Sequence, residues 1–182
     1  GGMVNTSCKV TYFRPVIKDY PSFEGFHYFS FMLIITSLDA LNEFRSAHVG
    51  TLGFVPTMGA LHAGHLSLVR KSKSRSDRTL VSIYVNPTQF NQAEDLEKYP
   101  RTLESDIAKL EAEGCDALYL PTTEQLYPNG PKSRTFDFGT LDCAMEGSGR
   151  PGHFEGMATV VTRFFELIKP NFAFFGEKDY QQ

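Results

Sequence analysis

The stretch that decides the fold is residues 51–69, which read TLGFVPTMGALHAGHLSLV. Its first five residues form a short apolar run, which is typical of a buried strand. A turn-rich segment through Gly59 and Gly64 follows, and the apolar residues from Leu66 onward begin a helical pattern. We therefore predict a strand, a loop and a helix in succession, with two histidines, His62 and His65, where the loop meets the helix.

The same alternation extends to both sides of this segment. Apolar, β-branched runs predict strands at 33–35, 51–55, 79–85, 117–120 and 172–175. Helices are expected after the Thr36-x-x-Asp39 capping pattern, from Leu66 into Lys73, from Thr102 to a terminating Gly114, and over 157–168, with a hairpin-like region around Phe136 and Phe138. The run at 79–85 is β-branched and apolar at Leu80, Val81, Ile83 and Val85, as in a strand buried on both faces of a parallel sheet. We predict an α/β fold, a Rossmann-like doubly wound parallel sheet, in which ligands bind beyond the carboxyl ends of the strands.

Composition bounds the class of protein. The chain has 182 residues, 18 Lys and Arg against 21 Asp and Glu, a net charge of -3 and 41% hydrophobic residues. One domain with a sizeable core is the expectation. The near-neutral charge gives no basic patch of the kind that binds nucleic acid, so we expect no nucleic-acid partner. Residues 1–31 show no sustained period and are predicted to be an N-terminal extension, with the Rossmann-like domain over 32–182.

Cysteine use and hydropathy indicate a compartment. Cys8, Cys115 and Cys143 are odd in number and widely spaced, which predicts neither a disulfide framework nor a zinc ribbon. The apolar stretch from Phe26 to Ile35 is about half the length that a membrane span needs, and its flanks fit a signal peptide poorly. We therefore expect reduced thiols, no membrane association and a cytoplasmic location.

His62 and His65 flank a glycine at a predicted helix N-terminus. Unpaired backbone N–H groups and the helix dipole make such a position an anion site, and Gly64 would let a phosphate approach the backbone. Two imidazoles can donate hydrogen bonds to phosphate oxygens, whose charge rises during phosphoryl or nucleotidyl transfer. Two other interpretations stay open: a pair of partly exposed loop histidines, and a zinc site, for which no third Cys or His stands in an obvious position. A G-x-G-x-x-G fingerprint and a Walker A loop are absent from the sequence.

At these residues the sequence resembles a known family. Residues 54–68 are similar to the H-I-G-H-type signature of the pantoate–β-alanine ligases (pantothenate synthetases), within the HxGH nucleotidyltransferase superfamily. Further matching motifs follow in order at 85–90, at 94–96 with 99–102, at 126–128, at 150–154 and at 175–182, where the sequence reads FGEKDYQQ. The resemblance covers the chain from Leu33 to its end, and residues 1–31 find no counterpart.

The resemblance implies an ATP-dependent amide ligase of coenzyme A biosynthesis. Such an enzyme condenses pantoate with β-alanine to give pantothenate, through a pantoyl-adenylate intermediate and without a covalent enzyme intermediate. ATP is implied as a bound nucleotide, with Mg²⁺ as its counter-ion. Family members are typically homodimers, so a homodimer is expected here too.

The resemblance also implies roles for individual residues. His65 would be the proton donor, with His62 as its partner and Lys178 at the phosphates. The ATP-binding positions would be Met58, Gly59, Ala60, Leu61, His62, Ala63, Gly64, His65, Gly176, Glu177, Lys178 and Asp179; pantoate would be held by Pro56, Thr57, Gln89 and Gln182, with β-alanine also near Gln89. Neutral amides suit pantoate because they bind its hydroxyls and carboxylate without adding charge. No residue is assigned as a metal ligand.

Other residues remain open at this point. Arg150 and His153 either approach substrate or only fix their loop. Asp95 and Asp106 are available carboxylates, but their spacing alone makes neither a ligand. The aromatic residues are predicted to be core side chains and not a base-stacking platform: Phe164, Phe165, Phe172, Phe174 and Phe175.

The sequence departs from the family pattern after residue 182. Family members continue with a K-M-S-type loop and a smaller C-terminal domain that closes over the nucleotide, and both are missing here. Since closure excludes water and completes the charged site, we expect a truncated form with low activity. Two rival functions remain: a nucleotidyltransferase with a phosphate-bearing acceptor, for which no basic pocket is found, and a non-catalytic nucleotide-binding or dimerisation module.

Overall fold

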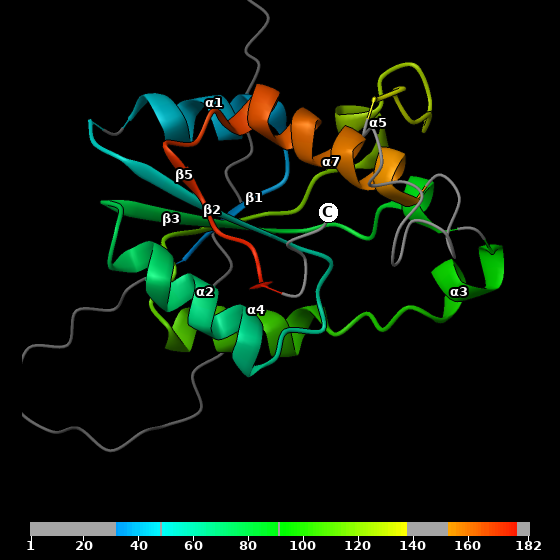
Figure 1. Cartoon of the computed structure of the whole chain (residues 1–182). Coiled ribbons are helices and arrows are strands. Elements are labelled where there is room, and N and C mark those ends of the chain that lie inside the picture. Colours follow the sequence, from blue (N-terminus) through cyan, green and yellow to red (C-terminus); the bar gives the residue numbers. More distant parts are fainter. Residues whose placement is uncertain (1–31, 48, 91, 138–152, 178–182) are drawn as a thin grey trace, which may run out of the picture.

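A single parallel sheet organises the chain. The computed structural model describes residues 32–47, 49–90, 92–137 and 153–177. Within them lies a five-stranded sheet in the order β1-β4-β3-β2-β5, with every pair parallel (Figure 1). The strands are β1 (Leu33–Ile35), β2 (Leu52–Thr57), β3 (Arg78–Ile83), β4 (Ala117–Tyr119) and β5 (Phe172–Ala173). The predicted α/β Rossmann-like fold is thereby confirmed.

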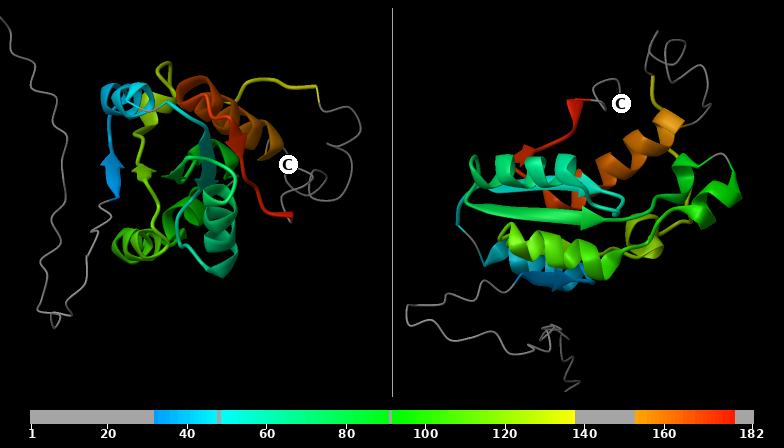
Figure 2. Two further views of the ribbon diagram at one scale, coloured as in Figure 1. Left: turned by 90° about the vertical axis from the view of Figure 1, so that its left-hand side faces the viewer. Right: turned by 90° about the horizontal axis from the view of Figure 1, so that it is seen from below.

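Helices cover both faces of this sheet. One face carries α1 (Leu38–Ser46) and α7 (His153–Ile168), and the other carries α2 (Ala63–Lys73) and α4 (Leu103–Ala112) (Figures 1 and 2). Three shorter elements lie in the connections: the 3-10 helix η1 (Pro87–Gln89), α3 (Ala93–Lys98) and α5 (Thr123–Leu126). In the described part of the chain, no helix has the length and apolar character that crossing a membrane requires.

The central strands are buried on both faces. Phe54, Leu80 and Ala117 are side by side on β2, β3 and β4, in a core cluster that faces α1 and α7. Their neighbours Val55 and Val81 point the other way, into a second cluster under α2 and α4. This double burial explains why the 79–85 segment is mostly apolar, and the prediction of a strand buried on both faces is confirmed.

One predicted thiol lies in the second cluster. Cys115 is 1% exposed and is a free cysteine. Burial raises the pKa of its thiol to about 12, so the group stays protonated and packs as a core side chain. Cys8 and Cys143 lie outside the described residues, as does the predicted extension at 1–31.

Several predicted boundaries were wrong because local hydrogen bonds decide them. The N-cap of α1 is Ser37 and not Thr36, since the Ser37 hydroxyl accepts from the Ala40 N–H at 3.2 Å. The helix α2 begins at Ala63 and α7 at His153, each a few residues before its apolar periodicity starts. In the predicted hairpin-like region, Phe136 is in irregular structure and Phe138 lies outside the described residues.

The prediction that five C-terminal phenylalanines are core side chains was right for one of them and wrong for three. Phe164 is 3% exposed and packs against Phe54. Phe165, Phe172 and Phe175 are between 38% and 44% exposed. Phe172 is in β5, a short strand at the edge of the sheet that pairs with β2 among the described residues, so its side chain has a neighbouring strand on one side only. Phe165 is on α7 and is not among the buried residues of that helix.

The connection after β3 is held tightly against α7. Gly156 lies so close to η1 that a Cβ at this position would be 2.5 Å from the backbone oxygen of Thr88. The Gly156 carbonyl also accepts a hydrogen bond of 3.1 Å from the Asn86 side chain. This close approach sets the position of Gln89 at the end of η1.

We predict that Gly156→Ala destabilises the protein by about 1–3 kcal/mol. Alanine has the higher helix propensity, but its methyl group would clash with backbone atoms of η1, which can move only if the whole segment shifts. Urea unfolding followed by circular dichroism measures the change. The control is Glu155→Ala on the same turn, which is expected to change stability by about 0.5 kcal/mol or less. A Gly156→Ala protein as stable as the wild type would contradict the packing argument.

Candidate active site

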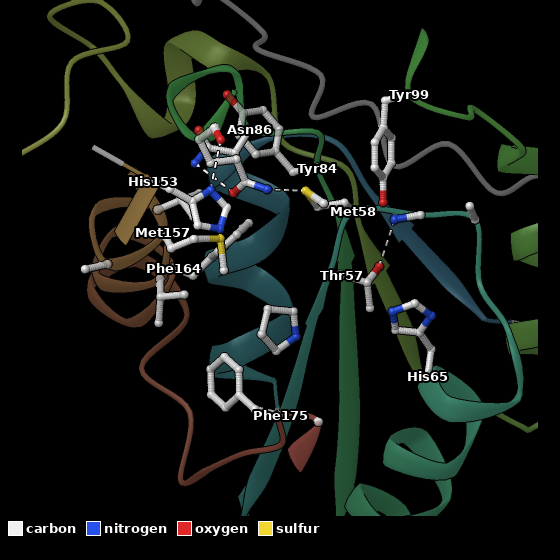
Figure 3. A pocket seen from close by; sticks show the side chains of 18 of the residues that line it. Thr57, Met58, His65, Tyr84, Asn86, Tyr99, His153, Met157, Phe164 and Phe175 are labelled. Carbon is white, nitrogen blue, oxygen red and sulfur yellow. Dashed lines mark hydrogen bonds between the residues drawn. The ribbon is translucent and has the colours of Figure 1, made fainter. Parts of the chain in front are cut away.

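A cavity of about 1090 Å³ opens where β2 and β3 end, with α7 as its opposite wall (Figure 3). Ten of the predicted site residues line it: Pro56, Thr57, Met58, Gly59, Ala60, His62, His65, Gln89, Gly176 and Glu177. Three further predicted residues do not: Leu61 is in the core, and Ala63 and Gly64 are exposed at the start of α2. Lys178 lies outside the described residues. Asp179 and Gln182 are likewise outside them. The cavity thus gathers three loops that follow strands.

The loop after β2 is held by one buried carboxylate. Asp106, on α4, accepts hydrogen bonds from the backbone N–H groups of Ala60 (2.9 Å) and Leu61 (2.8 Å). It also accepts from the Thr102 hydroxyl at 3.1 Å, and its side chain is 1% exposed. Lys109 completes the group, donating to the Leu61 carbonyl at 2.7 Å and lying 3.7 Å from Asp106.

This anchoring keeps the loop in an unusual backbone conformation. Gly59 has φ +88° and Ala60 has φ +50°, both in the left-handed region. At Gly59 a Cβ would also stand 3.1 Å from the Ile83 side chain and 3.3 Å from the Asp106 carboxylate. A left-handed conformation is unfavourable for an alanine such as Ala60. The two backbone N–H groups that donate to Asp106 stabilise the turn in spite of this cost.

The role of Asp106 was not predicted from the sequence. There, Asp106 and Asp95 are both available carboxylates, and neither has an assigned role. The signal was present, because Asp106 is three residues after Leu103 and four before Leu110, on the inward face of its helix. An acidic residue on such a face needs buried donors, and the loop supplies them. Asp95, by contrast, is exposed on α3.

The two histidines form a capping box at the start of α2. The Gly64 N–H donates to His62 Nδ1 at 3.1 Å, and the His62 N–H donates to His65 Nδ1 at 3.4 Å. A nitrogen that accepts carries no hydrogen, so each neutral ring has its hydrogen on Nε2. The rings lie 4.1 Å apart between centroids. The capping geometry therefore supplies two Nε2–H donors beside a helix N-terminus, which suits an anion.

Glycine at position 64 has a reason other than the one predicted. A Cβ there would be 2.9 Å from Cε1 of the His62 ring. The space that the missing side chain leaves is therefore taken up by the capping imidazole, whereas a phosphate was predicted to use it.

Asn86 connects the loop after β3 to α7. The side chain is 1% exposed, and its oxygen accepts from Tyr127 (2.8 Å) and from both the N–H and the hydroxyl of Thr88. Its amide nitrogen donates to Gln89 Oε1 at 3.3 Å, and Gln89 Nε2 in turn contacts the Met58 sulfur. The Gln89 side chain is thus fixed at the cavity wall. The sequence motif at 85–90 contains Asn86 but indicates no role for it, because two of its partners, Tyr127 and Gly156, are far away in the sequence.

Two tyrosines border this network as neutral groups. Burial raises the pKa of Tyr84 to about 12, and its hydroxyl donates to Thr123 at 3.3 Å. Burial also raises the pKa of Tyr127. This effect is larger than that of its hydrogen bonds with Thr88 and Asn86, which lower the pKa. Both hydroxyls consequently stay protonated and act as donors.

His153 had two predicted roles, and the structure is consistent with both. Its Nδ1 lies 3.0 Å from the Gln89 backbone oxygen, which ties the start of α7 to η1, and its ring also lines the cavity (Figure 3). Arg150, considered with it, lies outside the described residues. Among the residues that the structure describes, no three His, Cys, Asp or Glu side chains gather to hold a metal ion.

Comparison with known proteins identifies relatives. A family model described as pantoate-beta-alanine ligase matches residues 33–182. The pantothenate synthetase of Flavobacterium psychrophilum is 55% identical over 133 residues, which are 72% of this chain and 47% of that protein. The pantothenate synthetase of Bacteroides fragilis is 53% identical over 148 residues, 81% of this chain and 52% of that protein. The chain spans about half the length of the curated relatives it matches.

Solved structures agree with the sequence comparisons. The structure of a pantoate-beta-alanine ligase from Francisella tularensis, complexed with beta-gamma ATP and beta-alanine, matches with a TM-score of 0.80 and 44% identity. The match covers 83% of this chain and 59% of that one. A pantothenate synthetase from Thermus thermophilus matches with a TM-score of 0.75 and 46% identity, over 82% of this chain and 54% of that one.

We predict that Asp106→Ala lowers the free energy of unfolding by about 3 kcal/mol, because three donors lose their acceptor inside the protein. Hydrogen exchange at the Ala60 and Leu61 amides should become faster than in the wild type, and urea unfolding gives the stability. The matched control is Asp95→Ala, an exposed carboxylate, with an expected change of about 0.5 kcal/mol or less. Equal effects of the two substitutions would show that the loop does not depend on Asp106.

A second prediction separates helix capping from anion binding at His62. His62→Ala should cost about 1 kcal/mol of stability, whereas His62→Asn should cost little, since asparagine is itself a good N-cap. Both variants lack the Nε2–H donor, so both should bind inorganic pyrophosphate about tenfold more weakly in calorimetry, the effect of one hydrogen bond to a charged group. If His62→Asn binds pyrophosphate as tightly as the wild type and only the destabilised His62→Ala binds it more weakly, a direct contact between His62 and the anion is contradicted.

Proposed function

The chain belongs to the pantoate-beta-alanine ligase family, and we propose that residues 33–182 hold the ATP, pantoate and β-alanine sites of such a ligase. The observation that carries this proposal is the pair of capping histidines at the start of α2, which lines the same cavity as Gln89. Their Nε2–H donors suit phosphate oxygens, and Gln89 suits a hydroxy acid. One cavity can therefore hold the nucleotide next to the acid that it activates.

The first step we propose is formation of pantoyl adenylate. A carboxylate oxygen of pantoate attacks the α-phosphorus of ATP, the new P–O bond forms, and the bond to the leaving pyrophosphate breaks. Negative charge grows on the phosphate oxygens during this substitution. His62 and His65 stabilise that charge through their Nε2–H groups, which the backbone already holds in place. We propose His65 as the proton donor of the site in the form of a hydrogen-bond donor: its Nε2–H group donates to an oxygen of the leaving pyrophosphate, and the hydrogen stays on the ring.

The other residues divide between the two substrates. We propose that Met58 to His65 and Gly176 to Asp179 contact ATP, with Lys178 at the phosphates. Pro56, Thr57, Gln89 and Gln182 hold pantoate, and Gln89 is near β-alanine as well. The Thr57 hydroxyl donates to the Ser82 carbonyl at 2.8 Å, so its part in binding is through position and shape.

Further proposals follow the family resemblance. We propose Mg²⁺ as the counter-ion of ATP, a homodimer and a cytoplasmic location. We also propose that residues 1–182 by themselves catalyse the reaction slowly, because adenylate formation needs water excluded from the phosphates and the cavity is open at one side. Pyrophosphate release by this chain and by a longer form measures the difference.

Pantoate-dependent ATP–pyrophosphate exchange tests the function. We expect exchange by this chain only when pantoate is present. In His65→Gln the side chain of the third helical residue can still accept the hydrogen bond from the N-cap backbone N–H, but the imidazole donor is gone. Exchange should therefore fall by about 100-fold. Binding of ATP should weaken far less than exchange does. Exchange that is absent with pantoate, or unchanged in His65→Gln, would favour a non-catalytic nucleotide-binding module.

A further inference from the structure

His153 is the first residue of α7, is 7% exposed and lines the cavity. Its Nδ1 lies 3.0 Å from the backbone oxygen of Gln89. A carbonyl oxygen only accepts hydrogen bonds, so Nδ1 must be the donor and must carry the hydrogen. In the neutral ring, Nε2 is then a bare acceptor.

This tautomer is the opposite of the one at the start of α2. His62 and His65 accept from backbone N–H groups through Nδ1 and therefore present Nε2–H donors. His153 donates through Nδ1 and presents an Nε2 acceptor. The same cavity thus carries donors at the histidine pair and an acceptor at α7 (Figure 3).

Most other acceptors of the cavity wall are already engaged. The Thr57 hydroxyl accepts from the Gly59 N–H, the Gln89 side-chain oxygen accepts from Asn86, and the Asn86 oxygen accepts from Thr88 and Tyr127. For His153, the hydrogen bond seen within the described residues is the one through Nδ1. Nε2 is therefore an acceptor at the α7 side of the cavity, in addition to the Glu177 carboxylate, which we assign to ATP.

We propose that His153 Nε2 accepts a hydrogen bond from the amino group of β-alanine; this rests on the proposed function. Pantoate and ATP bring carboxylate and phosphate oxygens, which the donors at His62, His65 and the Gln89 amide suit. The amine is the substrate group that calls for an acceptor. Gln89 fixes the His153 ring through its backbone carbonyl, and the Gln89 side chain and the His153 ring line the same cavity.

The contact also serves the second chemical step. β-Alanine arrives as an ammonium ion, and one of its protons passes to His153 Nε2, which frees the nitrogen lone pair. The lone pair attacks the carbonyl carbon of pantoyl adenylate, the C–N bond forms, and the bond from that carbon to the phosphate oxygen breaks. AMP leaves with the electron pair, and the second nitrogen proton passes to water.

Nitrogen-15 NMR of the histidine rings tests this in the whole chain. Free His153 should show the Nδ1–H tautomer, with His62 and His65 as Nε2–H tautomers. Addition of β-alanine with a non-hydrolysable ATP analogue should move the His153 Nε2 resonance toward its protonated position. Propionate has the same carboxylate and length but no amine, and it should leave that resonance in place. An Nε2–H tautomer at His153, no response to β-alanine, or an equal response to propionate or to pantoate overturns the proposal.

A variant pair adds a kinetic measurement. His153→Asn keeps an N–H where Nδ1 stands but has no atom at Nε2, and amide formation should fall at least about tenfold more than pantoate-dependent exchange, within the range of acid–base contributions. Hydroxylamine, which is a neutral nucleophile, should restore most of the loss. An equal fall in both reactions means that His153 acts only through the fold and overturns the proposal. If the wild-type chain shows no pantoate-dependent exchange, the proposed function itself fails, whereas the NMR result still decides the His153 contact.

Discussion

The buried carboxylate of Asp106 is the constraint on which the site depends. The chain must leave β2 at Thr57 and enter α2 at Ala63, and in between it passes through left-handed conformations at Gly59 and Ala60. Two N–H groups in this turn would lie unpaired next to the core if Asp106 did not accept from them. The carboxylate therefore fixes where α2 begins, and with it the direction of the two histidine rings. A residue on α4, which does not line the cavity, thus positions the groups that do.

The alternation of strands and helices could be predicted because burial on both faces of a parallel sheet leaves a strong apolar pattern. The loop at 56–65 could be located for the same reason, since it lies between two strongly patterned segments. The start of α2 could not, because histidine is not among the usual N-cap residues and its ring was assigned to a ligand instead of to the Gly64 N–H. At the other end of the chain, apolar phenylalanines in an edge strand look like core residues until the pairing of the strand is known.

The roles of the histidines show a more general limit. His62, His65 and His153 are the same residue type, yet backbone partners give them opposite hydrogen-bonding functions. For the first two the hydrogen-bond partner is within three residues, so the contact is local to the start of α2. For His153 the partner is Gln89, 64 residues away, and only the packing of α7 on η1 brings the two together. Tautomer, and hence chemical role, follows from tertiary structure there.

That packing also explains why one wall of the cavity is apolar. Gly156 lets α7 lie against η1, and the next turns of the helix then present Met157 and Val161 to the cavity while Phe164 reaches the core. The opposite wall consists of loops with N–H groups and imidazoles. Hydrogen bonds to a phosphate are stronger where one side of the site holds little water, because the local dielectric is lower. The apolar side of α7 therefore strengthens the N–H donors on the opposite wall of the cavity.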